Sequence, residues 1–142
     1  MRQIKTFIKI VLSVKNWPNV AWKSFITHQS VVANFRSGYV FEVSPSTWNE
    51  FLQYVDFFRY FKKGKINGTK ATISYEGKEL VLSFKGLKPI NLIEVFGEKI
   101  YDPFFKNVDF SNRIVVDVGA AFGDTPVFFA LRGAKKIIAI EP

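Results

Sequence analysis

Cysteine is absent from the 142 residues of this chain, and histidine occurs once, as His28. Without cysteine the chain can form no disulfide and offers no thiolate as a nucleophile or as a metal ligand. A single imidazole also leaves no set of histidines for a zinc site. The sequence therefore excludes cysteine-dependent chemistry, provides no metal site, and favours an intracellular, cytoplasmic protein.

The sequence also lacks an apolar run long enough to cross a membrane, which takes about 20 residues. Ile4, Phe7, Ile8, Val11 and Leu12 recur at helical spacing near the N-terminus. This spacing predicts an amphipathic helix over residues 3 to 14. We expect the helix to dock on its own domain, with attachment to a membrane surface through its basic face as the alternative.

Acidic residues are missing before Glu42, and the net charge of the chain is +8. A basic first third could attract an anionic partner such as nucleic acid, a phosphosugar or lipid headgroups. The lysines are spread along the chain, however, and no nucleic-acid-binding module is visible. We therefore favour a solvated basic face and expect no nucleic acid partner.

Apolar periodicity and turn residues predict a mixed α+β region over residues 1 to 110, with amphipathic helices and two hairpins. The hairpins are expected over residues 31 to 43 and residues 71 to 84. Between them, Ser44 and Pro45 predict the start of a helix whose broad aromatic face packs in a core.

Residues 111 to 142 are predicted to begin a doubly wound α/β domain. Residues 114 to 118 and residues 136 to 140 are apolar runs suited to parallel strands buried on both faces. A short crossover helix would connect them, with Thr125 as its N-cap and Pro126 at its first position.

The glycine turn between the first of these strands and the helix is the candidate site. Gly119 and Gly123 would let the backbone approach a ligand closely. Glu141, at the carboxyl end of the second strand, could accept hydrogen bonds from both hydroxyls of a ribose. The pattern predicts the first half of a nucleoside-cofactor site, with a ligand-free tight turn and a solvated Glu141 as the structural alternatives.

Two cofactors compete for this turn. A dinucleotide site requires glycine at the first, third and sixth positions, so that pyrophosphate can lie on the helix N-terminus. Those positions are Gly119, Ala121 and Asp124, and the Asp124 carboxylate would repel a pyrophosphate. S-adenosylmethionine has no phosphate, and Asp117 or the loop carbonyls could meet its methionyl ammonium. The residues therefore favour S-adenosylmethionine over NAD.

The segment VVDVGAAFGDTPVFFALRGAKKIIAIEP resembles the first two sequence blocks of class I S-adenosylmethionine-dependent methyltransferases. It is most similar to the FkbM family, in which a D-V-G-A-x-x-G-D-T turn and a G-A-x-x-V-x-A-x-E-P strand recur. The resemblance implies a Rossmann-like domain that binds S-adenosylmethionine and methylates a hydroxyl of a small molecule, such as a sugar. The residues that it assigns to the cofactor are Asp117, Gly119, Ala120, Gly123, Asp124, Thr125 and Glu141.

Within that set, the resemblance places Asp117, Gly119, Ala120 and Gly123 along the methionine part of the cofactor and Glu141 at the ribose. Helix capping is the alternative role of Asp124 and Thr125. Neither a catalytic base nor the methyl acceptor can be identified.

The chain ends at Pro142, before the further strands that such a methyltransferase needs. We therefore expect a truncated or partial chain that is inactive alone, or one whose sheet is completed by a second polypeptide or by self-association. A non-catalytic remnant or interaction protein is the first alternative function. A NAD-dependent Rossmann enzyme is the second.

Overall fold

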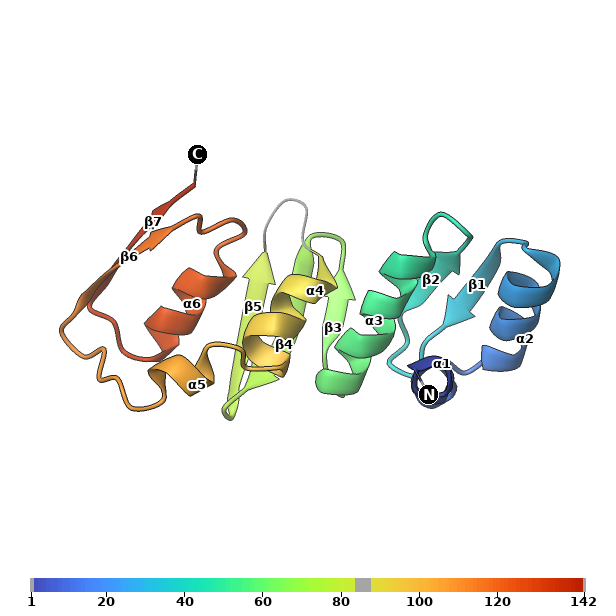
Figure 1. Ribbon diagram of the computed structural model, residues 1–142, viewed down its shortest axis with the longest axis horizontal. Coiled ribbons are helices and arrows are strands. Elements are labelled where there is room, and N and C mark those ends of the chain that lie inside the picture. Colours follow the sequence, from blue (N-terminus) through green and yellow to red (C-terminus); the bar gives the residue numbers. More distant parts are fainter. Residues whose placement is uncertain (1, 84–87, 142) are drawn as a thin grey trace. The chain divides into compact units, whose positions relative to one another are not determined.

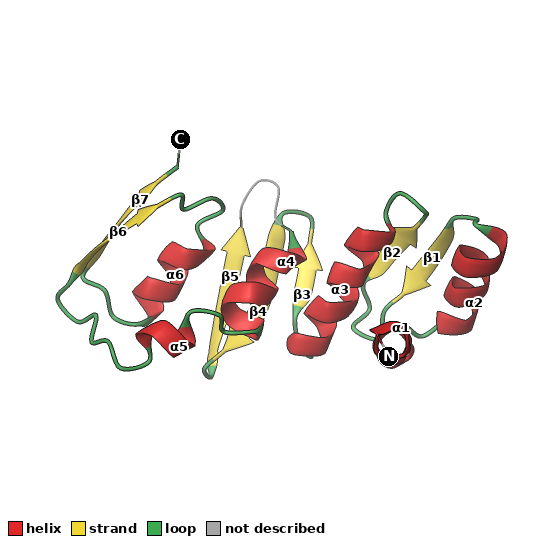
Figure 2. Ribbon diagram, in the orientation of Figure 1, coloured by secondary structure: helices red, strands yellow, loops and turns green. Residues whose placement is uncertain are grey.

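The computed structural model describes residues 2–83 and 88–141. The chain divides into two compact units, Met1–Ser83 and Phe84–Pro142, whose elements are traced in Figure 1. Each unit combines helices with small β-sheets, as Figure 2 shows. The chain is therefore a mixed α/β protein.

The described residues of the first unit form four helical segments and two small antiparallel sheets. Its helical segments are α1 (Arg2–Ser13), α2 (Trp17–Ala21), the π-helical η1 (Trp22–Thr27) and α3 (Trp48–Tyr60). Its strands are β1 (Val31–Asn34), β2 (Val40–Val43), β3 (Lys65–Asn67), β4 (Lys70–Tyr75) and β5 (Lys78–Ser83). β1 pairs with β2, and β3, β4 and β5 form a meander in that order, so both predicted hairpins are confirmed.

The core of the first unit forms where α3 meets the first hairpin. The Phe35 ring centroid lies 5.8 Å from that of Phe51 and 5.0 Å from that of Phe58, and all three side chains are buried. Tyr54 stacks on Tyr39, and burial raises the pKa of the Tyr54 phenol, with the hydrogen bond to Tyr39 adding to the rise. The prediction that the aromatic face of this helix packs in a core is confirmed.

Helix α3 begins at Trp48 rather than at the predicted Ser44 and Pro45. The Ser44 backbone N–H donates to the Thr47 hydroxyl oxygen at 2.8 Å, and that hydroxyl donates to the Glu42 carbonyl at 3.0 Å. These bonds close a turn over residues 44 to 47, because Ser and Thr hydroxyls compete with helical hydrogen bonding.

In the second unit, residues 88–141 form the predicted βαβ segment and three short helical segments before it. These are α4 (Pro89–Leu92), the π-helical η2 (Ile93–Gly97) and α5 (Asp102–Phe105). The βαβ segment consists of β6 (Ile114–Val118), α6 (Asp124–Leu131) and β7 (Lys136–Ile140), and its two strands pair in parallel.

Residues that precede position 111 pack on helix α6. The Tyr101 ring centroid lies 5.6 Å from that of Phe128, which is fully buried. The Phe110 ring lies 5.2 Å from that of Phe129. The compact unit that contains the glycine turn therefore starts earlier in the chain than residue 111, where the sequence placed the start of the α/β domain.

The prediction that both strands are buried on both faces is wrong. Val115 and Ile137 are half-buried, whereas Val116 and Val118 are exposed, the latter by 76%. Among the described residues, α6 packs on one face of the two strands and the opposite face is left exposed. A β-branched apolar run carries the same pattern whether one face or two are covered, so the sequence could not distinguish these cases.

Candidate functional site

The seven residues that the sequence assigns to the cofactor come together at the carboxyl ends of β6 and β7. They occupy the end of β6, the glycine turn, the first turn of α6 and the position after β7. In parallel α/β sheets this is the edge at which ligands bind.

The two glycines of the turn have left-handed backbone conformations. Gly119 has a φ of +83° and Gly123 a φ of +81°. A Cβ added at either position would meet no described atom within 4 Å. The need for glycine therefore comes from the backbone conformation, and the space beside the turn is open enough for a ligand to approach.

Backbone hydrogen bonds join the turn to the end of β7. The Ile140 carbonyl accepts from the Gly119 N–H at 2.8 Å and from the Ala120 N–H at 3.2 Å. The Gly123 N–H donates to the Ala120 carbonyl at 2.7 Å. Ala120 is buried. The turn is thus held by its own backbone before any ligand binds.

Glu141 lies against the same turn. Its Oε2 atom accepts a hydrogen bond from the Ala121 backbone N–H at 2.7 Å. Ala121 has a φ of +43°, and the sequence did not identify it as part of the site. The Glu141 side chain remains exposed, and a carboxylate has several acceptor positions, so it can hold the turn and bind a ligand hydroxyl together.

Two further carboxylates lie at this end of the strands. The Oδ2 atom of Asp117 is buried and has no hydrogen-bond partner in the part of the chain that the structure describes. Asp124 is buried as well, and burial raises the pKa of its carboxyl. The negative charge of Asp117 adds to this rise, and the backbone N–H groups of Asp124 and Thr125 oppose it.

Helix α6 begins at Asp124, with Gly123 in the N-cap position, so the prediction that Thr125 is the N-cap is wrong. Thr125 is the second residue of the helix and is half-buried. The left-handed conformation of Gly123 turns the chain into the helix two residues sooner than a Thr125 cap would require. The Asp124 carboxylate therefore lies in the first turn, where helix dipoles favour negative charge.

The arrangement favours a ligand with positive charge and hydroxyl groups. Buried carboxylates attract an ammonium group and repel a phosphate. Within the described ranges, no cluster of three or more acidic, histidine or cysteine side chains is suited to hold a metal ion. His28, the single histidine of the chain, is exposed and belongs to the other unit, after η1.

The chain was compared with protein-family models, with curated proteins and with solved structures, and nothing matches it in any of the three comparisons.

Proposed function

We propose that the glycine turn binds the methionine and ribose parts of S-adenosylmethionine, as part of a Rossmann-like methyltransferase of FkbM type that methylates a hydroxyl. The observation that carries this proposal is the buried Oδ2 atom of Asp117, which has no partner among the described residues. Leaving such an atom unpaired is costly, and a ligand ammonium at the end of β6 would pair with it.

Five residues of the site have a stated place in this proposal. Asp117 binds the ammonium of the methionyl group, and the Asp124 carboxyl lies near enough for the charge of Asp117 to raise the Asp124 pKa. Gly119 and Gly123 keep the approach to the turn open, because neither places a side chain there. Glu141 accepts hydrogen bonds from the ribose hydroxyls while it holds the Ala121 N–H.

When bound, S-adenosylmethionine supplies a methyl group that is electrophilic because it is attached to a positively charged sulfur. The protein contributes mainly by binding and orientation, since methyl transfer to an aligned hydroxyl needs little covalent assistance. The Asp117 carboxylate fixes one end of the ligand and Glu141 fixes the ribose. Together they would determine where the methyl group points.

The same residues argue against NAD. A dinucleotide would bring its pyrophosphate to the first turn of α6, where the buried Asp124 carboxylate lies. The resulting repulsion has no counterpart in S-adenosylmethionine. We therefore favour the methyl donor over the dinucleotide.

Ligand titrations monitored by NMR test the proposal, because NMR detects weak as well as tight binding. We expect S-adenosylhomocysteine to bind more tightly than NAD. We also expect it to bind more tightly than 5′-methylthioadenosine, which keeps the nucleoside but lacks the ammonium. Asp117→Asn should reduce the preference for S-adenosylhomocysteine over 5′-methylthioadenosine by about tenfold, as for a lost charged hydrogen bond.

Glu94→Gln is the matched control, because Glu94 is an exposed acid of the same unit that lies in η2. This variant should leave both affinities unchanged. Tighter binding of NAD than of S-adenosylhomocysteine would rule out the proposed cofactor. An unchanged preference in Asp117→Asn would show that Asp117 does not bind the ammonium.

The exposed face of β6 and β7 favours a second candidate, an interaction protein in which this face contacts another polypeptide. Val116 and Val118 would lie in such a contact. This candidate predicts association that Val116→Asp disrupts, together with no binding of the nucleosides above. Sedimentation velocity measures the association, and the same titrations measure the binding.

A further inference from the structure

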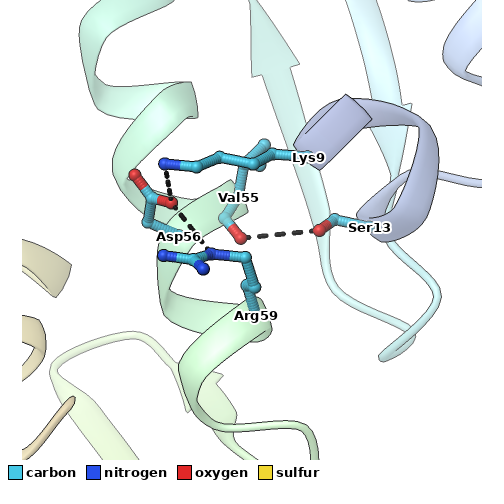
Figure 3. Close-up of polar contacts among 5 residues, drawn as sticks. All are labelled: Lys9, Ser13, Val55, Asp56 and Arg59. Carbon is cyan, nitrogen blue, oxygen red and sulfur yellow. Dashed lines mark hydrogen bonds and ion pairs between the residues drawn. The ribbon is translucent and has the colours of Figure 1, made fainter. Parts of the chain in front are cut away.

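Helix α1 packs on α3 through polar side chains as well as apolar ones. Figure 3 shows Lys9 and Ser13 pointing toward α3. The Lys9 Nζ atom lies 2.8 Å from Asp56 Oδ1, and the Ser13 hydroxyl donates to the Val55 carbonyl at 3.5 Å. Ile10 is buried. The prediction that this helix docks on its own domain is confirmed.

The apolar stripe of the same helix is exposed. Ile4, Ile8 and Leu12 follow each other at intervals of four residues, so they share one face, and they are 65%, 51% and 66% exposed. A helix on the surface of a globular domain usually buries its apolar stripe and exposes its polar face. Here the stripe lies outward while Lys9 and Ser13 face α3.

An aromatic pair extends this exposed apolar surface from α1 to α2. Phe7 is itself exposed, and its ring meets the Trp17 ring edge to face, with 5.3 Å between the centroids. Aromatic rings with one apolar and one wet side are common at the boundary between water and lipid. Through this pair, the exposed apolar surface includes a residue of α2 as well as residues of α1.

Basic residues border the stripe at both of its ends. Lys5 is exposed and, by helical spacing, lies beside the stripe. At the other end, Leu12 lines an open pocket of about 400 Å³ together with Arg36, Arg59 and Lys62. Arg59 is engaged by Asp56 at 3.4 Å, so Arg36 and Lys62 are the cations best placed to meet an anion. No acidic residue precedes Glu42 in the sequence.

We propose that α1 lies in the headgroup region of an anionic lipid bilayer. Ile4, Ile8 and Leu12 would face the acyl chains, and Arg36 and Lys62 would meet lipid phosphates in the pocket beside Leu12. The helix has 12 residues, which gives it a length of about 18 Å in the plane of the membrane.

None of the helices formed by residues 2–83 and 88–141 has the length and apolarity needed to span a bilayer.

A second copy of the chain is a less suitable occupant of this surface. Pairing two α1 stripes would bring Lys5, Arg36 and Lys62 of one copy close to the same cations of the other. Like charges at an interface oppose association, whereas a phospholipid surface supplies the opposite charge. Charge complementarity therefore favours the membrane.

Flotation of the purified chain with lipid vesicles tests the proposal. We expect binding to vesicles of phosphatidylcholine mixed with phosphatidylglycerol, much weaker binding to phosphatidylcholine alone, and a decrease in binding as salt is added. Ile8→Asp should reduce the partition coefficient about tenfold or more, because it places a charge at the centre of the inserted face. Arg36→Gln and Lys62→Gln should reduce binding to the anionic vesicles only.

Val81→Asp is the matched control, because Val81 is an apolar residue of β5 with 62% exposure and the substitution changes charge equally. It should bind as the unmodified chain does. Circular dichroism should show that both aspartate variants remain folded, since both sites are exposed.

Three results would overturn the proposal. They are failure to bind either kind of vesicle, equal binding to both kinds, and equal binding of Ile8→Asp and Val81→Asp. A dimer that Ile8→Asp dissociates, seen by sedimentation without vesicle binding, would assign the stripe to a second copy. Because no methyl donor is needed, the result is independent of the function proposed for the glycine turn.

Discussion

The Glu141 carboxylate accepts a hydrogen bond from the Ala121 backbone N–H, with 2.7 Å between oxygen and nitrogen. Glu141, which the sequence assigns to a ribose, therefore also holds the glycine turn at the end of β7. Its removal should therefore affect stability and ligand affinity together.

Glu141→Ala and Glu141→Gln separate these two effects. Alanine removes the acceptor of the Ala121 N–H and should lower the free energy of unfolding by about 1 kcal/mol, whereas glutamine keeps a neutral acceptor and should cost less. Both variants lose the charged acceptor, so both should bind S-adenosylhomocysteine more weakly. Denaturant titrations and ligand titrations measure the two quantities. If Glu141→Ala changed neither, the observed contact would have no energetic role.

Substitutions at Gly119 test whether its backbone conformation limits the choice of residue. Gly119 has a φ of +83°, and no atom of the described residues lies within 4 Å of an added Cβ, so Gly119→Ala should destabilise by about 1 kcal/mol through backbone strain alone. Gly119→Asn should cost less, because asparagine adopts left-handed conformations more readily, and Gly119→Val should cost more. Denaturant unfolding of the three variants gives the order of their stabilities. Equal stabilities would show that the left-handed conformation is not required.

Asp124 should make stability depend on pH. Because its pKa is raised on folding, the stabilisation from this carboxyl is present at low pH and is lost as the pH rises through the raised value. Asp124→Asn stays neutral and keeps an oxygen acceptor. We expect this variant to melt at a higher temperature than the unmodified chain at neutral pH, with the difference shrinking as the medium is acidified. Thermal melts across this range measure it.

Asp109→Asn is a control for which we expect the opposite dependence of stability on pH. The backbone N–H of Ser111 donates to Asp109 Oδ1 at 2.8 Å, and this bond lowers the pKa of the Asp109 carboxyl. Its stabilisation is therefore present at neutral pH and is lost on acidification. The asparagine variant should be less stable than the unmodified chain at neutral pH and approach it in acid. Parallel pH trends for the two variants would contradict the opposite directions of the pKa changes.

The exposed face of β6 and β7 predicts tolerance to polar substitution. Val116→Thr should change the free energy of unfolding by less than about 0.5 kcal/mol, as is usual at surface positions. Phe128→Ala, in the fully buried centre of the same unit, should cost roughly 3–5 kcal/mol. Urea denaturation measures the free energy of unfolding of both variants. A cost at Val116 close to that at Phe128 would show that the face is covered in solution.

Local patterns were sufficient to predict the hairpins and the βαβ segment. The β1–β2 turn contains Ser37 and Gly38, and the β4–β5 turn contains Glu76 and Gly77. Of these residues, Gly38, Glu76 and Gly77 have positive φ. Such turn residues act over a few positions, which is why they can be read from the sequence. Strand β3 was missed, because Lys65–Asn67 has no apolar alternation and is a strand only through pairing with β4.

Features that depend on distant residues could not be predicted. The contact between Glu141 and Ala121 requires the register in which Val118 pairs with Ile140. The outward direction of the α1 stripe follows from which face of the helix packs on α3, the face that carries the buried Ile10 and the Lys9–Asp56 ion pair. The spacing of the apolar residues in α1 predicts the helix, but it does not determine which face is docked.

The two compact units differ in their tryptophan content. Trp17, Trp22 and Trp48 all belong to the first unit, and the glycine turn belongs to the second. Indole fluorescence will therefore report on the first unit, because the unit that holds Gly119 and Glu141 contains no tryptophan. Native-like emission from a refolded sample is therefore no evidence that the glycine turn has folded.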